Sequence, residues 1–307
     1  MNAMIKMAVG IAVAALTAAC DRTTTASDSP AHNASKAGGA YVETALGRLF
    51  VKTTGTGDAT LVLWPSIFTD HRIYDRVTAE LSDKFRFLLI DGPGHGGSEG
   101  PTEEFSIAQS ADAMAAVLDH YQIQSAVIGG TSWGGMTAAE LALSRPERVR
   151  GLILMNTPME IDGDDVDFSS RLISFGARYG LGFRFFRDGV AESFFSPEVL
   201  ENDPDFAATF HEMLKTANAR ELSASVRSVL LRGSPLMDRM AELNAPTLVI
   251  AGREDEMYPV HVQRAAASMA PQGEFALVAG KHISVVERPL DVARIIEDFV
   301  ARTAERR

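Results

Sequence analysis

The stretch that decides the fold reads Val127-Ile128-Gly129-Gly130-Thr131-Ser132-Trp133-Gly134-Gly135-Met136. An apolar run ends at two glycines, and a helix-forming run begins after two more. The centre fits the pattern G-x-S-x-G, which is typical of a tight strand-to-helix turn that lifts a serine hydroxyl out of the backbone. Ser132 is therefore a candidate nucleophile, favoured by the free amides of the following helix. The alternative is a glycine-rich turn of a doubly wound sheet in which Ser132 only caps the helix.

Strands and helices alternate on both sides of this turn. Apolar residues at helical spacing indicate helices at 105–121 and 290–303. The expected strands lie at 41–46, 48–54, 60–64, 85–90, 126–128, 151–156, 247–251 and 274–278. This order predicts an α/β fold with a mainly parallel central sheet and helices on both faces. Ligands of such a sheet bind at the carboxyl ends of its strands.

One segment, residues 159–243, breaks the alternation and contains nine of the sixteen phenylalanines. We interpret it as an inserted helical cap, with residues 41–158 and 244–307 forming the core domain. This phenylalanine cluster is expected to be the packed core of the cap; the alternative is a pocket wall that faces the active site. A further hypothesis is that one arginine on the first half of the cap reaches a substrate carboxylate. The candidates are Arg171, Arg178, Arg184 and Arg187.

The N-terminus has the composition of an export signal. Lys6 is the only charge before Cys20, and the apolar run from Met7 to Ala19 is shorter than the roughly 20 residues needed to cross a bilayer. Residues 1–19 are therefore predicted to be a signal peptide.

Cys20 is the only cysteine in the chain. The sequence Leu16-Thr17-Ala18-Ala19-Cys20 resembles a bacterial lipobox, in which the cysteine becomes the lipidated first residue. Residues 20–40 have few apolar side chains and predict a lipidated, flexible tether. We thus expect an exported, membrane-anchored lipoprotein that faces the periplasm; an ordinary cleaved signal is the alternative.

The charge and composition of the chain limit the classes of partner that it is expected to bind. The formal charge is −11 and no long basic run is present, which argues against nucleic acid and against direct binding to an anionic membrane. Membrane contact is expected only through the lipid anchor, and the partner is expected to be a small molecule. No cluster of histidine and cysteine has metal-ligand spacing, so neither a metal nor a cofactor is expected.

A nucleophilic serine needs a base, and the base needs an orienting acid. Of seven histidines, His282 lies just past the last expected strand, at its carboxyl end. The loop after the preceding strand carries Glu254, Asp255 and Glu256, and Asp255 has the best reach. The chain order Ser132, Asp255, His282 is the nucleophile–acid–base order expected for such a sheet.

With these motifs placed, residues 41–303 resemble the α/β-hydrolase superfamily. The motifs are Gly130 to Gly135, Asp91-Gly92-Pro93-Gly94-His95-Gly96-Gly97-Ser98, Gly252 to Pro259, and Gly280-Lys281-His282 with Glu287 and Pro289. Within the superfamily, segments 66–74 and 152–158 are similar to the 3-oxoadipate enol-lactonase-like branch. Trp64-Pro65 stands where most relatives carry His-Gly.

The resemblance implies a serine hydrolase that cleaves small, partly apolar esters or lactones through an acyl-enzyme. The oxyanion would be bound by the backbone N–H of Trp133 and by that of Ser66, since Pro65 has no N–H. A C–C bond hydrolase or a cofactor-free haloperoxidase would use the same triad. Epoxide hydrolases and haloalkane dehalogenases are disfavoured because both need an aspartate where Ser132 stands.

Overall fold

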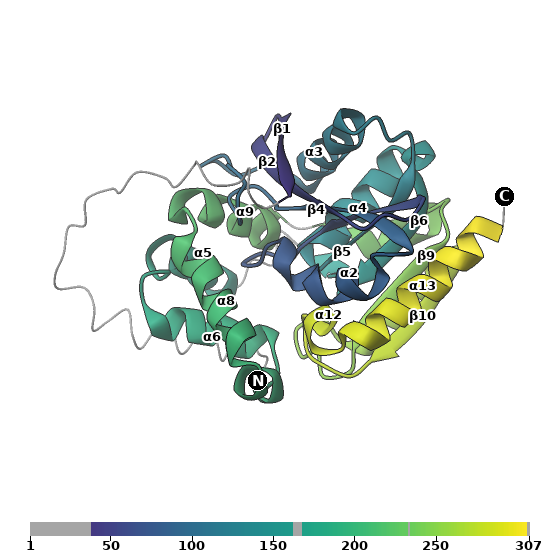
Figure 1. Ribbon diagram of the computed structural model, residues 1–307. Helices are drawn as coiled ribbons and strands as arrows, with labels where there is room; N and C mark the ends of the chain where they lie inside the picture. The colour runs from purple at the N-terminus through teal and green to yellow at the C-terminus, as the bar shows by residue number, and fades with distance from the viewer. Residues whose placement is uncertain (1–37, 162–167, 233, 306–307) are drawn as a thin grey trace.

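An eight-stranded sheet forms the centre of the computed structural model, which describes residues 38–161, 168–232 and 234–305 (Figure 1). Its strand order is β1-β2-β4-β3-β5-β6-β9-β10. The strands are β1 (Gly39–Thr44), β2 (Gly47–Thr54), β3 (Ala59–Trp64), β4 (Phe85–Ile90), β5 (Ala126–Thr131), β6 (Val149–Met155), β9 (Thr247–Gly252) and β10 (Gly273–Val278). The pairs β1–β2 and β2–β4 are antiparallel. The other five pairs of this sheet, from β4–β3 to β9–β10, are parallel. The predicted, mainly parallel fold class is therefore confirmed.

Helices cover both faces of this sheet (Figure 1). α3 (Ile107–His120) packs against α4 (Trp133–Ser144), and α2 (Asp75–Leu81) packs against α13 (Pro289–Glu305). α11 (Val260–Met269) lies on β9 and β10. Shorter helical turns are η2 (His71–Tyr74), η3 (Pro146–Arg148), η4 (Met240–Glu242) and α12 (Ser284–Glu287). Because both faces are covered, β5 and β9 are buried along their whole length.

The register of the parallel strands brings their carboxyl ends to one edge. Trp64 of β3 lies opposite Gly130 of β5, Thr131 opposite Met155 of β6, and Gly252 of β9 opposite Val278 of β10. The loops that follow these strands carry four candidate residues, which are in chain order Ser66, Ser132, Asp255 and His282. The topology thus gathers residues that are far apart in the sequence.

A helical insertion follows β6 and stands to one side of the sheet (Figure 1). It comprises α5 (Phe168–Tyr179), α6 (Arg184–Phe194), α7 (Pro197–Asn202), α8 (Pro204–Thr216), α9 (Ala219–Arg232) and α10 (Leu236–Arg239). The sequence pattern predicted no strand here, but β7 (Glu160–Ile161) and β8 (Ser234–Pro235) form a short antiparallel ladder. Two residues per strand are too few to leave a detectable alternation of apolar and polar side chains.

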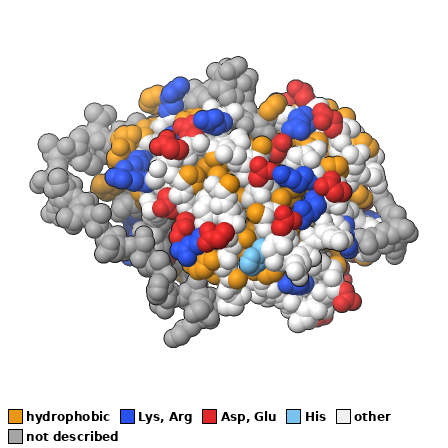
Figure 2. Space-filling view, turned by 90° about the horizontal axis from the view of Figure 1, so that it is seen from above, with side chains coloured by type: hydrophobic (Ala, Val, Ile, Leu, Met, Phe, Trp, Pro, Cys, Tyr) orange, Lys and Arg blue, Asp and Glu red, His pale blue; other side chains and the backbone are white. Residues whose placement is uncertain are grey.

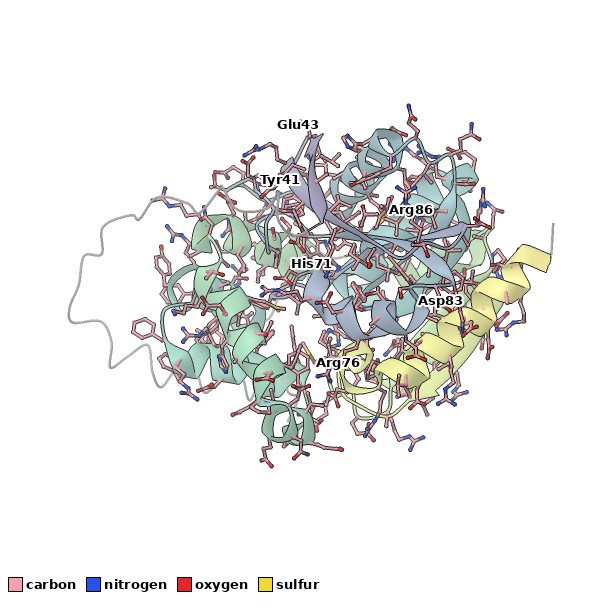
Figure 3. The ribbon with its side chains drawn as sticks, viewed as in Figure 1. Tyr41, Glu43, His71, Arg76, Asp83 and Arg86 are labelled. Atoms are coloured by element: carbon pink, nitrogen blue, oxygen red, sulfur yellow. The ribbon has the colours of Figure 1, made fainter. Side chains whose placement is uncertain are left out.

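Polar contacts fasten this cap to the core. Arg76 of α2, labelled in Figure 3, forms an ion pair with Asp203 at the start of α8. On α9, the Ser225 hydroxyl donates to the Pro93 carbonyl (2.6 Å), and the Ser228 hydroxyl accepts from the Phe105 N–H (2.8 Å). α9 is therefore seated on the loop that follows β4.

The predicted signal peptide, Cys20 and nearly all of the predicted tether lie outside the described residues. Among the helices that are described, none combines the length and the apolar character needed to cross a bilayer. On the face seen in Figure 2, acidic and basic side chains are interspersed with apolar ones.

Candidate active site

Ser132 occupies a strained turn between β5 and α4. Its φ of 55° and ψ of −114° lie where non-glycine residues are rare. The flanking glycines are required by close packing: a Cβ on Gly130 would lie 2.3 Å from the carbonyl carbon of Gly134, and one on Gly134 would lie 1.8 Å from the Trp64 oxygen. The turn is therefore a strand-to-helix elbow, as the sequence pattern indicated, and it holds the hydroxyl at the carboxyl edge of the sheet.

The structure brings Ser132, His282 and Asp255 together in one hydrogen-bonded chain. The Ser132 Oγ lies 2.9 Å from the Nε2 of His282, and the Nδ1 of the same ring lies 3.1 Å from the Oδ2 of Asp255. All three side chains are buried. This is the arrangement in which an imidazole removes a serine proton while a carboxylate sets its tautomer.

Asp255 is held ionised by its surroundings. Its Oδ1 accepts from the backbone N–H groups of Met257 (3.0 Å) and Tyr258 (3.2 Å). Burial acts to raise the pKa of the carboxyl, but the charge of His282 and hydrogen bonds from His282, Asn156 and Tyr258 outweigh it and hold that pKa below its usual value. The carboxylate is therefore charged at neutral pH and able to stabilise an imidazolium.

Asn156 is a site residue that sequence reasoning missed. It follows β6 with a positive φ of 47°, and its Nδ2 donates to Asp255 Oδ2 (3.0 Å) and to the Lys281 carbonyl (3.2 Å). Its Oδ1 accepts from the Ser284 hydroxyl. Asparagine tolerates this backbone conformation better than most residues. A polar residue directly after a buried strand was the signal that could have identified it.

The neighbouring acids have other partners. Glu254 accepts a hydrogen bond from the Gly280 N–H, and Glu287 accepts from the N–H groups of Lys281 (3.2 Å) and Ser196 (2.9 Å). These bonds hold the loop that carries His282 and join it to the cap. Glu254 therefore supports the loop, whereas Asp255 contacts the imidazole.

The structure places the Ser66 backbone beside the elbow. A Cβ on Gly134, in the first turn of α4, would lie 3.0 Å from the Pro65 oxygen. Ser66 is buried, its carbonyl accepts from the Thr69 N–H (3.3 Å) and hydroxyl (2.9 Å), and its own hydroxyl has no partner in the described part of the chain. The amides of Ser66 and of Trp133, at the start of α4, remain the proposed oxyanion donors.

We expect Ser66→Ala to change kcat little, because the hydroxyl has no partner. Ser66→Pro deletes the N–H and should lower kcat about 10²–10³-fold if one oxyanion donor is lost. Steady-state kinetics on a short-chain ester checks both variants. A large loss in the alanine variant would show that the hydroxyl itself matters and would contradict the backbone assignment.

Comparison with known protein families matches residues 59–289 to the family described as the alpha/beta hydrolase fold. The chain belongs to this family. It is 26% identical over 242 residues to the 3-oxoadipate enol-lactonase 2 of Acinetobacter baylyi, covering 79% of this chain and 88% of that protein. It is 27% identical over 263 residues to the pimeloyl-[acyl-carrier protein] methyl ester esterase of Yersinia enterocolitica, covering 83% and 98%.

Solved structures share the fold of this α/β hydrolase. The enol-lactonase of Burkholderia xenovorans superposes with a TM-score of 0.78 at 24% identity, covering 85% of this chain and all of that one (100%). A thermophilic esterase from Thermogutta terrifontis gives a TM-score of 0.79 at 24% identity, covering 86% and 98%. At this level of identity the likeness shows the fold alone.

Aromatic rings border the triad of this α/β hydrolase. The Phe194 ring of α6 lies 5.4 Å from the imidazole of His282, and the Tyr258 ring lies 5.3 Å from it. Phe68, in the loop after β3, lies 6.2 Å from both Phe194 and Phe186 of α6. Part of the phenylalanine cluster thus contacts the site, and Phe195 and Phe210 pack within the cap. The expectation of a packed cluster holds only in part, because four of its members are exposed: Phe168, Phe175, Phe183 and Phe185.

A second cluster of titratable groups lies in the loops after β3 and β4. Asp70 and Asp91 each contribute a carboxylate oxygen, and His71 contributes a ring nitrogen; these three atoms lie within 4.8 Å of one another. Such an arrangement could hold a metal (His71 is labelled in Figure 3). Each group already has internal partners: Asp70 pairs with Arg72, and the Nδ1 of His71 lies 2.8 Å from Asp91. These bonds join the two loops. The sequence did not predict this cluster, because Asp91 is 20 positions from His71 in the chain. The two residues meet only because β3 pairs with β4.

Proposed function

We propose that the protein is a serine hydrolase that cleaves carboxylic esters or lactones of small, partly apolar substrates through an acyl-enzyme. The observation that carries the proposal is the hydrogen-bonded chain from Ser132 through His282 to Asp255 at a strained elbow. The esterase and lactonase names of the relatives support the same class of bond.

In the first half-reaction, the His282 Nε2 takes the proton of Ser132 as Oγ attacks the ester carbonyl. The oxyanion that forms accepts hydrogen bonds from the N–H groups of Ser66 and Trp133. When the tetrahedral intermediate collapses, the alkoxide leaves and takes the proton from His282; in a lactone it stays attached to the acyl group. Asp255 stabilises the imidazolium throughout.

In the second half-reaction, His282 removes a proton from water, which attacks the acyl carbon. Collapse of the second tetrahedral intermediate releases the carboxylic acid and returns the proton to Ser132. These steps use groups that the chain itself supplies. A C–C bond hydrolase or a cofactor-free haloperoxidase built on the same triad is the alternative function, and a substrate panel separates it.

The orientation of α6 bears on the charge of the substrate. Phe186, Val190 and Phe194 form one buried stripe of this helix, next to the triad. Arg184 and Arg187 line a surface hollow with His211, and the Arg184 side chain is 82% exposed.

The other two cap arginines also lie away from the triad. Arg171 and Arg178 line a surface groove with Arg227, between α5 and α9. The hypothesis that a cap arginine reaches a substrate carboxylate therefore has no support in this arrangement. We infer a neutral substrate, since the rings beside His282 would offer a carboxylate no counter-charge.

We expect hydrolysis of p-nitrophenyl esters to fall steeply from short to long acyl chains. If the aromatic rings beside His282 enclose the acyl group, overpacking them costs about 1–3 kcal/mol, and each step of roughly 1.36 kcal/mol is tenfold in rate. p-Nitrophenyl butyrate should likewise be preferred to mono-p-nitrophenyl succinate, which is of similar length but charged. The measurement is kcat/KM for each ester, with the Ser132→Ala protein as the blank.

Two results would contradict the substrate proposal. Equal or better rates on emulsified long-chain esters would show that the cap opens to lipid, as in a lipase. A preference for the succinate ester would show that a cation does face the site.

We also propose that the chain is exported and anchored to a membrane through Cys20. The support is the apolar run that ends at the single cysteine. Cys20→Ser should move the protein from the membrane fraction to the soluble periplasm or block processing. Mass spectrometry of the mature N-terminus decides the matter, because an unmodified residue downstream of Cys20 would refute lipidation.

A further inference from the structure

His95 is a buried histidine that the triad does not use. It lies in the loop after β4, and the Trp133 ring packs 5.4 Å from it. Its Nδ1 lies 2.9 Å from the carbonyl oxygen of Pro93, and its Nε2 lies 2.9 Å from the backbone nitrogen of Phe68. One ring therefore joins two loops that are far apart in the sequence.

These two partners fix the tautomer of His95. A carbonyl oxygen can only accept, so Nδ1 must carry the proton; a backbone N–H can only donate, so Nε2 must be bare. Only the neutral ring with its proton on Nδ1 satisfies both bonds. Burial lowers the pKa of His95 against the opposing effects of the Pro93 carbonyl and of Asp91 and Asp70, which keeps the ring in this neutral form.

The bond to Phe68 lies within the proposed oxyanion loop. Phe68 is two residues after Ser66 and has a positive φ of 64°, a conformation that a phenylalanine rarely adopts unless other bonds hold it. The next residue, Thr69, donates to the Ser66 carbonyl. A shift of Phe68 would therefore move the Ser66 amide.

The other end of the contact reaches the cap. The Pro93 oxygen that accepts from His95 also accepts from the Ser225 hydroxyl of α9 (2.6 Å). The chain of bonds runs from Ser225 through Pro93 and His95 to Phe68, and it connects the seat of α9 with the oxyanion loop.

We propose that His95 is a positioning residue that holds the Ser66 amide in place for the oxyanion and relays the docking of cap helix α9 to that amide. The inference rests on the proposed serine hydrolase function. Its effect is expected in the chemical step, because the donors act on charge that develops in the transition state.

The test compares His95→Leu with His95→Gln. The leucine variant removes the acceptor for the Phe68 N–H, and we expect kcat to fall about 10²-fold, as for a misplaced catalytic group, with KM changed less than about threefold. The glutamine amide can accept from Phe68 and donate to Pro93, so kcat should stay within about tenfold of wild type. The rate at which a p-nitrophenyl phosphonate inactivates Ser132 should follow the same order, because that reaction uses the same amides.

Ser98→Ala is the matched control. The Ser98 hydroxyl is buried in the same loop; it accepts from the Phe50 N–H (2.8 Å) and donates to the Asp91 carbonyl (2.7 Å), and neither bond involves the oxyanion loop. It should lower the thermal midpoint without lowering kcat. On α9, Ser225→Ala should lower kcat several-fold, whereas Ser228→Ala, which leaves the Pro93 oxygen untouched, should not.

The outcomes are separable. A folded His95→Leu protein with wild-type kcat and phosphonate reactivity overturns the proposal and leaves the hydrolase function standing. A loss confined to KM, or an equal kcat loss in Ser98→Ala, would show that His95 only supports the fold. If His95→Leu fails to fold, equal kcat in the Ser225→Ala and Ser228→Ala proteins overturns the relay. A wild-type protein that neither hydrolyses esters nor takes the phosphonate refutes both the relay and the function.

Discussion

Ser132→Ala is expected to remove nearly all esterase activity, with kcat falling roughly 10⁴–10⁶-fold as in other triads. The variant deletes the oxygen that lies 2.9 Å from the His282 Nε2, and no other described serine or threonine hydroxyl is hydrogen-bonded to that atom. A phosphonate probe should label Ser132 alone in the wild-type protein and nothing in the variant. Peptide mass spectrometry identifies the labelled residue.

Ser66→Ala is the matched control, because it also removes a buried serine hydroxyl at the carboxyl edge of the sheet. It should retain both labelling and activity. Labelling of another residue, or Ser132→Ala activity within about tenfold of wild type, would refute Ser132 as the nucleophile.

Asp255→Asn is expected to fold normally and to lose roughly 10²–10⁴ in kcat by mis-setting the tautomer of His282. In the wild-type site, Asp255 Oδ2 lies 3.1 Å from Nδ1 and also accepts from Asn156. The asparagine amide carries no charge, and its NH2 group donates where the carboxylate accepted. The imidazolium therefore loses the negative charge that stabilised it. Circular dichroism checks that the variant folds, and kcat on a short-chain ester measures the loss of activity.

Glu254→Gln is the control for this variant. Its carboxylate bonds the Gly280 N–H, and a glutamine oxygen can accept the same bond. The control should therefore keep kcat near that of wild type. If Glu254→Gln lost activity and Asp255→Asn did not, the assignment of the orienting acid would be wrong.

Local patterns were enough to predict the sheet and the elbow. Continuous apolar runs such as 60–64 predicted strands buried on both faces, and β3 is buried at its carboxyl half. The glycines around Ser132 predicted the turn: a Cβ on Gly130 would collide with Gly134 inside the motif, whereas the collision that excludes a Cβ on Gly134 is with Trp64 of the neighbouring strand β3. His282 could be chosen among seven histidines because only its position follows the last strand.

Contacts between distant loops were beyond such patterns. Asn156 bonds Asp255 across 99 positions of sequence, and His95 bonds Phe68 across 27. Neither residue sits in a periodic pattern that marks its partner, so only the strand order places them together. The same holds for the Asp70, His71 and Asp91 cluster.

The cap shows where composition stops being informative. Its excess of phenylalanine and arginine suggested a wall and a counter-charge, but helix α6 buries Phe186 and Phe194 while Phe185 and Arg184 of the same helix are exposed. Side chains at successive positions of a helix point in different directions, so a residue count does not say which of them face the site.

The sequence by itself determined the alternation of strand and helix, the strained serine turn and the order of nucleophile, acid and base, because each depends on the sterics and periodicity of neighbouring residues. Only the tertiary structure decided which carboxylate touches His282, which asparagine supports it, and which two loops His95 joins. Those contacts depend on strand register and on how the cap docks, and both are set by burial summed over the whole chain.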